Sequence, residues 1–186
     1  IWPLFLKKTG LKDSDFKTVS GDAQTKLNAV INNQADLLLG YVMDQAIKLQ
    51  DAVHKPVYPI RFADHGVNMV SSGFIVQKDY LKEKPDVVKR FLRAATKSLE
   101  EAAKNPEAAV DAMLAAKPKS GVKETALVGM KNTAALYKGP DNPKDRPLRV
   151  GRKNMDETLA LLVEYGGLDK ASAGKAGDYY TNEYLP

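Results

Sequence analysis

The chain of 186 residues contains no cysteine, which excludes disulfide bonds, thiolate catalysis and zinc sites built on cysteine. It also has no apolar run near the roughly 18 residues that a membrane-spanning helix needs. The opening stretch IWPLFLKK is too short for a signal peptide. The chain begins at Ile1 without a methionine, so we expect that processing or truncation has removed a preceding segment.

Sequence motifs of common enzyme classes are missing as well. The chain has no GxSxG, no GxxxxGKS/T, no HExxH and no GxGxxG pattern. The spacing of His54 and His65 matches no recognised set of metal ligands. We therefore predict no catalytic residue, no metal site and no cofactor, and a protein that is not an enzyme.

Charge is scattered along the chain. There are 28 Lys and Arg side chains against 23 Asp and Glu, a net charge of +5. The densest basic run, KDYLKEKPDVVKRFLRAATK, has apolar residues at helical spacing, which indicates a solvated helix face. Because nucleic-acid-binding proteins usually show a clustered basic stripe or a recognisable module, we predict no nucleic-acid partner.

Residues 1–66 alternate between helical and strand patterns. Helices are predicted in IWPLFLKKTG, DAQTKLNAVINNQ and MDQAIKLQDAV, and strands in DFKTVSG, ADLLLGY and KPVYPIRFADHG. Such alternation with short links predicts an α/β fold with a parallel sheet.

Residues 67–186 are mostly helical after one more predicted strand, GFIVQKDYL. Four helices are predicted, from Pro85, from Pro106 behind the cap Asn105, over residues 122–137, and from about Met155 to an end at Gly166 and Gly167. A parallel sheet needs several strands with helices on both faces. We therefore expect that further strands precede residue 1.

Several stretches together resemble one family. The succession RFADHGVN, GFIVQKDYLKEKPDVVKRFLRA, NPEAAVDAML, LLVEYGGLD and YYTNEYLP resembles the substrate-binding proteins of ABC importers for nitrate, sulfonates, taurine and thiamine-pyrimidine precursors. The pyrimidine-precursor branch is the most similar, and the resemblance extends over essentially the whole chain. It implies a two-lobed α/β fold of the periplasmic-binding-protein type (type II), with the ligand between the lobes. Residues 1–66 would be α/β lobe two, and residues 67–186 the hinge strand and helical C-terminal part of lobe one.

The resemblance also implies a function. The protein would be the non-catalytic solute-binding component of an ABC importer, capturing a thiamine-pyrimidine precursor or a sulfonate- or nitrate-type anion. It would be periplasmic or extracellular and associated with the membrane through its permease. A further expected partner is the missing N-terminal lobe segment or a second copy of the chain. The alternative is a thiamine-pyrimidine synthase of the same fold, an iron-using enzyme whose cysteine-rich motif has no counterpart here.

Candidate ligand residues follow from the predicted strand ends, because ligands of open parallel sheets lie beyond the carboxyl ends of strands. In VSGDAQ, Ser20 and Asp22 could each hydrogen-bond a ligand, with the alternative, favoured for Asp22, that it is a helix N-cap. In LGYVMDQ, Tyr41 either stacks on a planar ring or packs under the next helix, and Asp44 has the same capping alternative as Asp22.

The third strand end, FADHGVN, supplies the strongest candidates. Asp64 can accept hydrogen bonds from an aminopyrimidine edge, and the Asn68 amide can both donate and accept. The alternative is a turn at Gly66 that these polar groups only shape. His65 either lines the cleft or packs at the hinge. The predicted ligand site therefore consists of Asp64, Asn68, Tyr41, Ser20 and His65.

Overall fold

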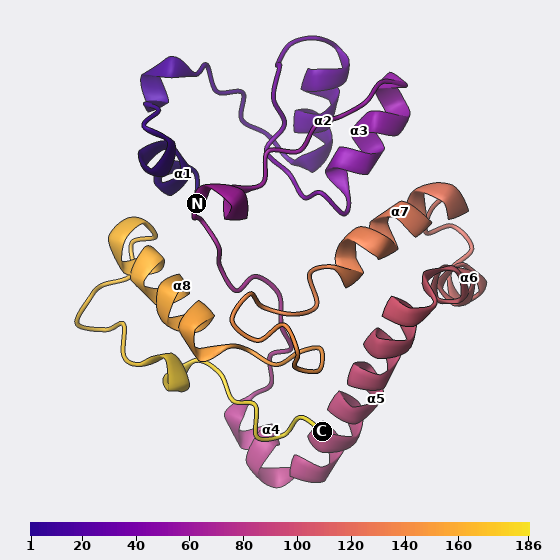
Figure 1. The fold of residues 1–186 in the computed structure, drawn as a ribbon, viewed down its shortest axis with the longest axis vertical. Coiled ribbons are helices and arrows are strands. Elements are labelled where there is room, and N and C mark those ends of the chain that lie inside the picture. The colour runs from indigo at the N-terminus through magenta and orange to yellow at the C-terminus, as the bar shows by residue number, and fades with distance from the viewer. The chain divides into compact units, whose positions relative to one another are not determined.

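The computed structural model describes residues 1–186, and all its regular elements are helical (Figure 1). The α-helices are α1 (Trp2–Thr9), α2 (Ala23–Ile31), α3 (Gln45–Val53), α4 (Lys78–Glu83), α5 (Pro85–Lys104), α6 (Pro106–Ala116), α7 (Lys123–Ala134) and α8 (Arg152–Tyr165). Three short 3-10 helices complete the set, namely η1 (Asp13–Asp15), η2 (Phe62–His65) and η3 (Ala176–Asp178).

The chain divides into two compact units. Unit 1 comprises residues 1–13, 61–100 and 136–186, and unit 2 comprises residues 14–60 and 101–135. The long helix α5 contributes residues to both units. The predicted lobes, residues 1–66 and 67–186, divide the chain in another way, and that division stays a prediction.

Several helix ends coincide with local sequence signals, namely a glycine or a capping side chain. α1 ends at Gly10, which adopts the left-handed conformation with φ of 73° that favours glycine. Asp22 caps α2 by accepting a hydrogen bond from the Thr25 backbone N–H at 2.7 Å, so its predicted capping role is confirmed. Asn105 caps α6 in the same way, accepting from the Ala108 N–H at 3.1 Å.

The strand predictions are not confirmed. DFKTVSG, ADLLLGY, KPVYPIRFADHG and GFIVQKDYL contain no strand, and no ladder of backbone hydrogen bonds joins them. The third segment ends in η2, and the fourth runs into α4. A strand is stable only when a neighbouring strand pairs with its N–H and C=O groups. Without that pairing the α/β lobe is not confirmed, although the composition of these segments favours strands.

Apolar side chains of the same segments lie in solvent as a result. Ile75 is 99% exposed, Tyr58 84% and Leu37 63%. Residues of these types are usually buried in folded proteins. The disagreement between sequence pattern and structure is therefore concentrated in the predicted strands.

A first apolar cluster of unit 1 joins α1 to the segment around η2. Leu4 and Phe5 of α1 are buried together with Val67. The Phe5 ring stacks on Phe62 of η2 with the ring centroids 4.6 Å apart. Side chains that pack around this cluster include Leu161 and Tyr165 of α8. The aromatic contacts hold residues 62–67 against α1.

A second apolar cluster of unit 1 is built on the first half of α8. Met155 and Leu159 are buried against Ala176 of η3, and Val70 packs on the same group. Because α8 contributes to both clusters, one helix spans the apolar interior of unit 1.

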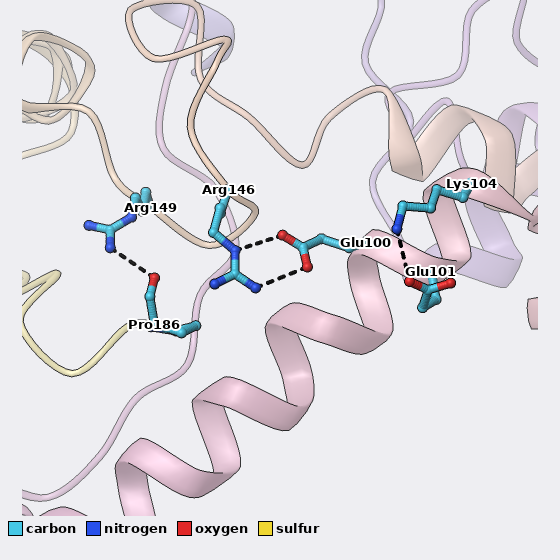
Figure 2. Close-up of polar contacts among 6 residues, drawn as sticks. All are labelled: Glu100, Glu101, Lys104, Arg146, Arg149 and Pro186. Carbon is cyan, nitrogen blue, oxygen red and sulfur yellow. Dashed lines mark hydrogen bonds and ion pairs between the residues drawn. The ribbon is translucent and has the colours of Figure 1, made fainter.

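The proline-containing loop before α8 is tied to α5 by an ion pair. The Arg146 guanidinium donates to both carboxylate oxygens of Glu100, at 2.7 and 3.0 Å (Figure 2). A bidentate pair fixes orientation as well as distance. Arg149 donates to the Pro186 carbonyl oxygen at 3.0 Å, so the same loop also holds the last residues of the chain (Figure 2).

Unit 2 consists of packed helices. α3 packs on α2 and α7, and α7 packs on α6. Its buried apolar residues are Leu27, Ala29, Ile47, Leu49 and Val110. Two side-chain hydrogen bonds join α7 to the rest of the unit, from Asn132 to the Val42 carbonyl at 3.1 Å and from Thr125 to Asp51 at 2.6 Å.

The start of α8 is capped by a residue from an earlier part of the chain. The N-cap itself, Gly151, has no side chain, and the Asp141 carboxylate accepts instead from the Asn154 N–H at 3.1 Å. A Cβ on Gly151 would overlap the Asp141 carboxylate. The cap therefore requires a glycine beside it.

We predict that Gly151→Ala lowers the free energy of unfolding by about 1–2 kcal/mol, because it displaces the Asp141 cap. Gly73→Ala is the matched control in unit 1, since a Cβ there meets no atom within 4 Å. Urea unfolding of both variants measures the difference. Equal urea midpoints for the two variants would contradict the stabilising role of the Asp141 cap.

Candidate functional site

Three of the five predicted ligand residues lie in or just after η2 in unit 1. The turn that follows η2 is made by backbone groups, with the Gly66 N–H donating to the Ala63 carbonyl at 3.2 Å and the Val67 N–H to the Phe62 carbonyl at 3.0 Å. Gly66 has φ of 75°, a left-handed conformation that costs glycine little. The turn at Gly66 is thus present. The Asp64 carboxylate makes no hydrogen bond to this turn and binds a side-chain partner instead.

That partner is Arg61, at the N-cap of η2. Arg61 donates from Nε to Asp64 Oδ2 at 2.9 Å and from Nη2 to Oδ1 at 2.7 Å. Both side chains are about half exposed, at 57% and 51%. The hydrogen bonds from Arg61 lower the pKa of Asp64, and the charges of Arg61 and His65 act in the same direction. A solute that binds Asp64 must share the carboxylate with Arg61 or displace it.

His65 and Asn68 each contact another element of unit 1, although His65 is exposed. The His65 imidazole meets the Phe5 ring edge to face, with the ring centroids 5.4 Å apart. Asn68 is half-buried, and its Nδ2 donates to Asn154 Oδ1 of α8 at 3.4 Å. Asn68 thereby faces a helix that the sequence analysis had not connected with the site.

Buried polar side chains of α8 are the feature that sequence reasoning missed. Asn154 and Thr158 are only 7% and 6% exposed, although both are polar. Thr158 Oγ1 donates to the Asn154 carbonyl at 2.7 Å and accepts from the Val70 N–H at 2.9 Å. A signal was available, because the two residues stand four apart, immediately before the buried Met155 and Leu159 on the same helix.

The other two predicted ligand residues, Ser20 and Tyr41, belong to unit 2. Both are exposed, and Tyr41 has 60% of its surface in solvent. The Tyr41 backbone N–H donates to Gln45 Oε1 at 2.8 Å, which holds the chain at the start of α3. Asp44 stands at the N-cap of α3, as its capping alternative expects, but it makes no capping hydrogen bond there and pairs instead with Lys48 at 2.6 Å.

A hollow of about 220 Å³ lies between α3, α7 and residues 57–59 of unit 2. It is lined mainly by apolar side chains, with the exposed carboxyl-bearing residues Asp51 and Glu124 among the others. A smaller hollow of about 100 Å³ lies at the start of α8, beside Asp141 and Asn154. None of the five predicted ligand residues lines either hollow.

Two further properties bear on the site. No group of three or more His, Cys, Asp or Glu side chains is arranged to hold a metal ion. No helix combines the length and apolar character needed to cross a membrane.

A family model described as NMT1/THI5 like matches residues 3–109. The match covers more than half of the chain. The chain belongs to the NMT1/THI5-like family. This confirms the resemblance to this type of substrate-binding protein and implies a periplasmic-binding-protein fold. The likeness of residues 110–186 to the family stays a prediction.

A curated relative is the riboflavin-binding protein RibY of Chloroflexus aurantiacus. It is 24% identical to this NMT1/THI5-like chain over 118 residues, which are 63% of the chain and 33% of RibY. The chain thus spans about a third of the length of this relative.

We predict that Arg61→Gln raises the pKa of Asp64 toward its ordinary value of 3.8, because the glutamine removes a charged donor. In the unsubstituted protein, stabilisation by the pair is complete at neutral pH. It is lost as pH falls through the folded pKa, below 3.8. Carboxyl NMR titration measures the shift. The same titration midpoint for Asp64 in both proteins would contradict the effect of Arg61 on its pKa.

Proposed function

We propose that this NMT1/THI5-like chain is part of the non-catalytic solute-binding component of an ABC importer. The observation that carries the proposal is the family match over residues 3–109. The name of RibY, which describes a binding protein, supports the same class of function. The absence of cysteine argues against the synthase alternative, since its iron motif is cysteine-rich. The proposed partner is a membrane permease, and the proposed location is periplasmic or extracellular.

The proposed solute is small, planar and heteroaromatic. The resemblance to the pyrimidine-precursor branch favours an aminopyrimidine, and RibY is named for binding riboflavin. Both molecules combine a flat ring with N–H donors, so one kind of site can recognise either class. Sulfonates and nitrate lack the ring, and we rank them below these two.

The proposed ligand residues have separate roles. Asp64 and Asn68 accept hydrogen bonds from the ring N–H groups, and Tyr41 stacks on the ring face. Ser20 and His65 supply further polar contacts at the edge. The proposal places these five residues around a cleft between lobes divided near residue 66.

We predict that the whole protein binds riboflavin or the aminopyrimidine precursor of thiamine in isothermal titration calorimetry. With pyridoxal phosphate and iron present, it should form no pyrimidine, because the chain has no cysteine-rich iron motif. Mass spectrometry against a sample without protein measures turnover. Product above that background would favour the synthase, and absence of binding to both probes would contradict the proposed solute class.

We predict that Asp64→Ala weakens binding of the preferred probe by roughly tenfold, because it leaves a ligand donor without its acceptor. Asp64→Asn keeps the shape and one acceptor oxygen, so its loss should be smaller. Asp156→Ala is the matched control, since Asp156 is another exposed carboxylate paired with an arginine, at 3.7 Å from Arg152.

Calorimetry and thermal melts of the three variants separate the two readings of Asp64. A lower melting temperature with unchanged affinity in Asp64→Ala would assign Asp64 to the scaffold of η2 and remove it from the site.

A further inference from the structure

The segment after the Gly66 turn lies along α8 and is held by it at two levels. Val67 belongs to the apolar cluster that includes α1, and Val70 packs on the cluster of Met155 and Leu159. Between these two apolar contacts the chain carries Asn68, a proposed ligand residue. The position of Asn68 therefore depends on how the segment is fixed to the helix.

The contacts that fix the segment are polar and partly buried, and their partners on α8 are buried. Thr158 uses its hydroxyl twice, donating to the Asn154 carbonyl at 2.7 Å and accepting from the Val70 N–H at 2.9 Å. Thr158 is 6% exposed. A partly buried backbone N–H that loses its partner carries a desolvation penalty to the extent that water does not reach it. The Thr158 hydroxyl thus contributes to the register of residues 68–70 on α8.

The second contact orients the Asn68 amide. Its Nδ2 donates to Asn154 Oδ1, and its Oδ1 accepts no hydrogen bond within the protein. The contact uses one of the two N–H groups of the amide, which leaves the second N–H and the carbonyl oxygen free. The Asn68 oxygen can therefore accept a hydrogen bond from a solute with N–H donors.

We propose that Thr158 and Asn154 are positioning residues for solute binding. Thr158 fixes the backbone at Val70, and Asn154 holds the Asn68 amide so that its oxygen stays available to the solute. This inference rests on the proposed function, in which Asn68 contacts the solute, and it adds the two residues of α8 that hold Asn68 in place.

The test compares Thr158→Val, which keeps the shape and removes the hydroxyl, with Thr158→Ser, which keeps the hydroxyl. Amide hydrogen exchange at Val70 reports the contact without ligand, and calorimetry with riboflavin and the thiamine aminopyrimidine reports affinity. We expect Thr158→Val to speed exchange at Val70 and to weaken binding by about tenfold. Thr158→Ser should stay close to the unsubstituted protein in both measurements. All affinities are measured well below the melting temperature of each variant.

A double-mutant cycle with Asn68→Ala separates positioning from general stability. If Thr158 acts through Asn68, adding Thr158→Val to Asn68→Ala should cause little further loss of affinity. Equal losses with and without Asn68 would overturn the positioning role, as would unchanged affinity in a folded Thr158→Val protein. Asn154→Leu serves as the second variant if Thr158→Val does not fold, with the same expected loss of binding and the same cycle.

Failure of the proposed function gives a different result. If the unsubstituted protein binds neither probe, the proposed solute class and the positioning role are both overturned. If the unsubstituted protein binds a probe but Thr158→Val and Thr158→Ser bind it with equal affinity, the positioning role alone is overturned.

Discussion

Unit 1 depends on the packing of one face of α8 against the segment that follows η2. That face is apolar at Met155 and Leu159 and polar at Asn154 and Thr158, and both kinds of residue are buried. Apolar contacts supply the driving force for burial, and the hydroxyl and amide give the contact a defined register. A helix with a purely apolar face could slide along the segment at little cost. The buried polar groups make a shifted register expensive, because each would then lose its partner.

Local signals in the sequence predict the helices well. Pro106 and its cap Asn105 mark the start of α6, and Gly10 marks the end of α1, because these effects act within one turn of the chain. The strands are predicted from local patterns of residue type. Val, Ile, Tyr and Phe in segments such as residues 73–76 favour a pleated surface, but strand formation needs hydrogen-bond partners that a local pattern cannot supply.

The candidate site shows the same contrast between local and distant information. Asp64, His65 and Asn68 stand out because a polar cluster at a glycine turn is visible within seven residues of sequence. The hydrogen-bond partners of these residues differ in how far away they lie in the sequence. Arg61 is three residues from Asp64 and its pairing was within reach of local reasoning, whereas Asn154 reaches Asn68 from 86 positions away. Only the folded chain connects that pair, so the orientation of the Asn68 amide was beyond prediction from the sequence.

The carboxylate of Asp141 at the start of α8 couples the first turn of the helix to the closure of the loop before it. Helix nucleation is unfavourable, and capping residues usually offset part of that cost from within the same short segment. Here the acceptor lies 13 positions before the N–H that it binds. The first turn of α8 therefore gains its cap only after the loop has closed, and this closure has its own entropy cost.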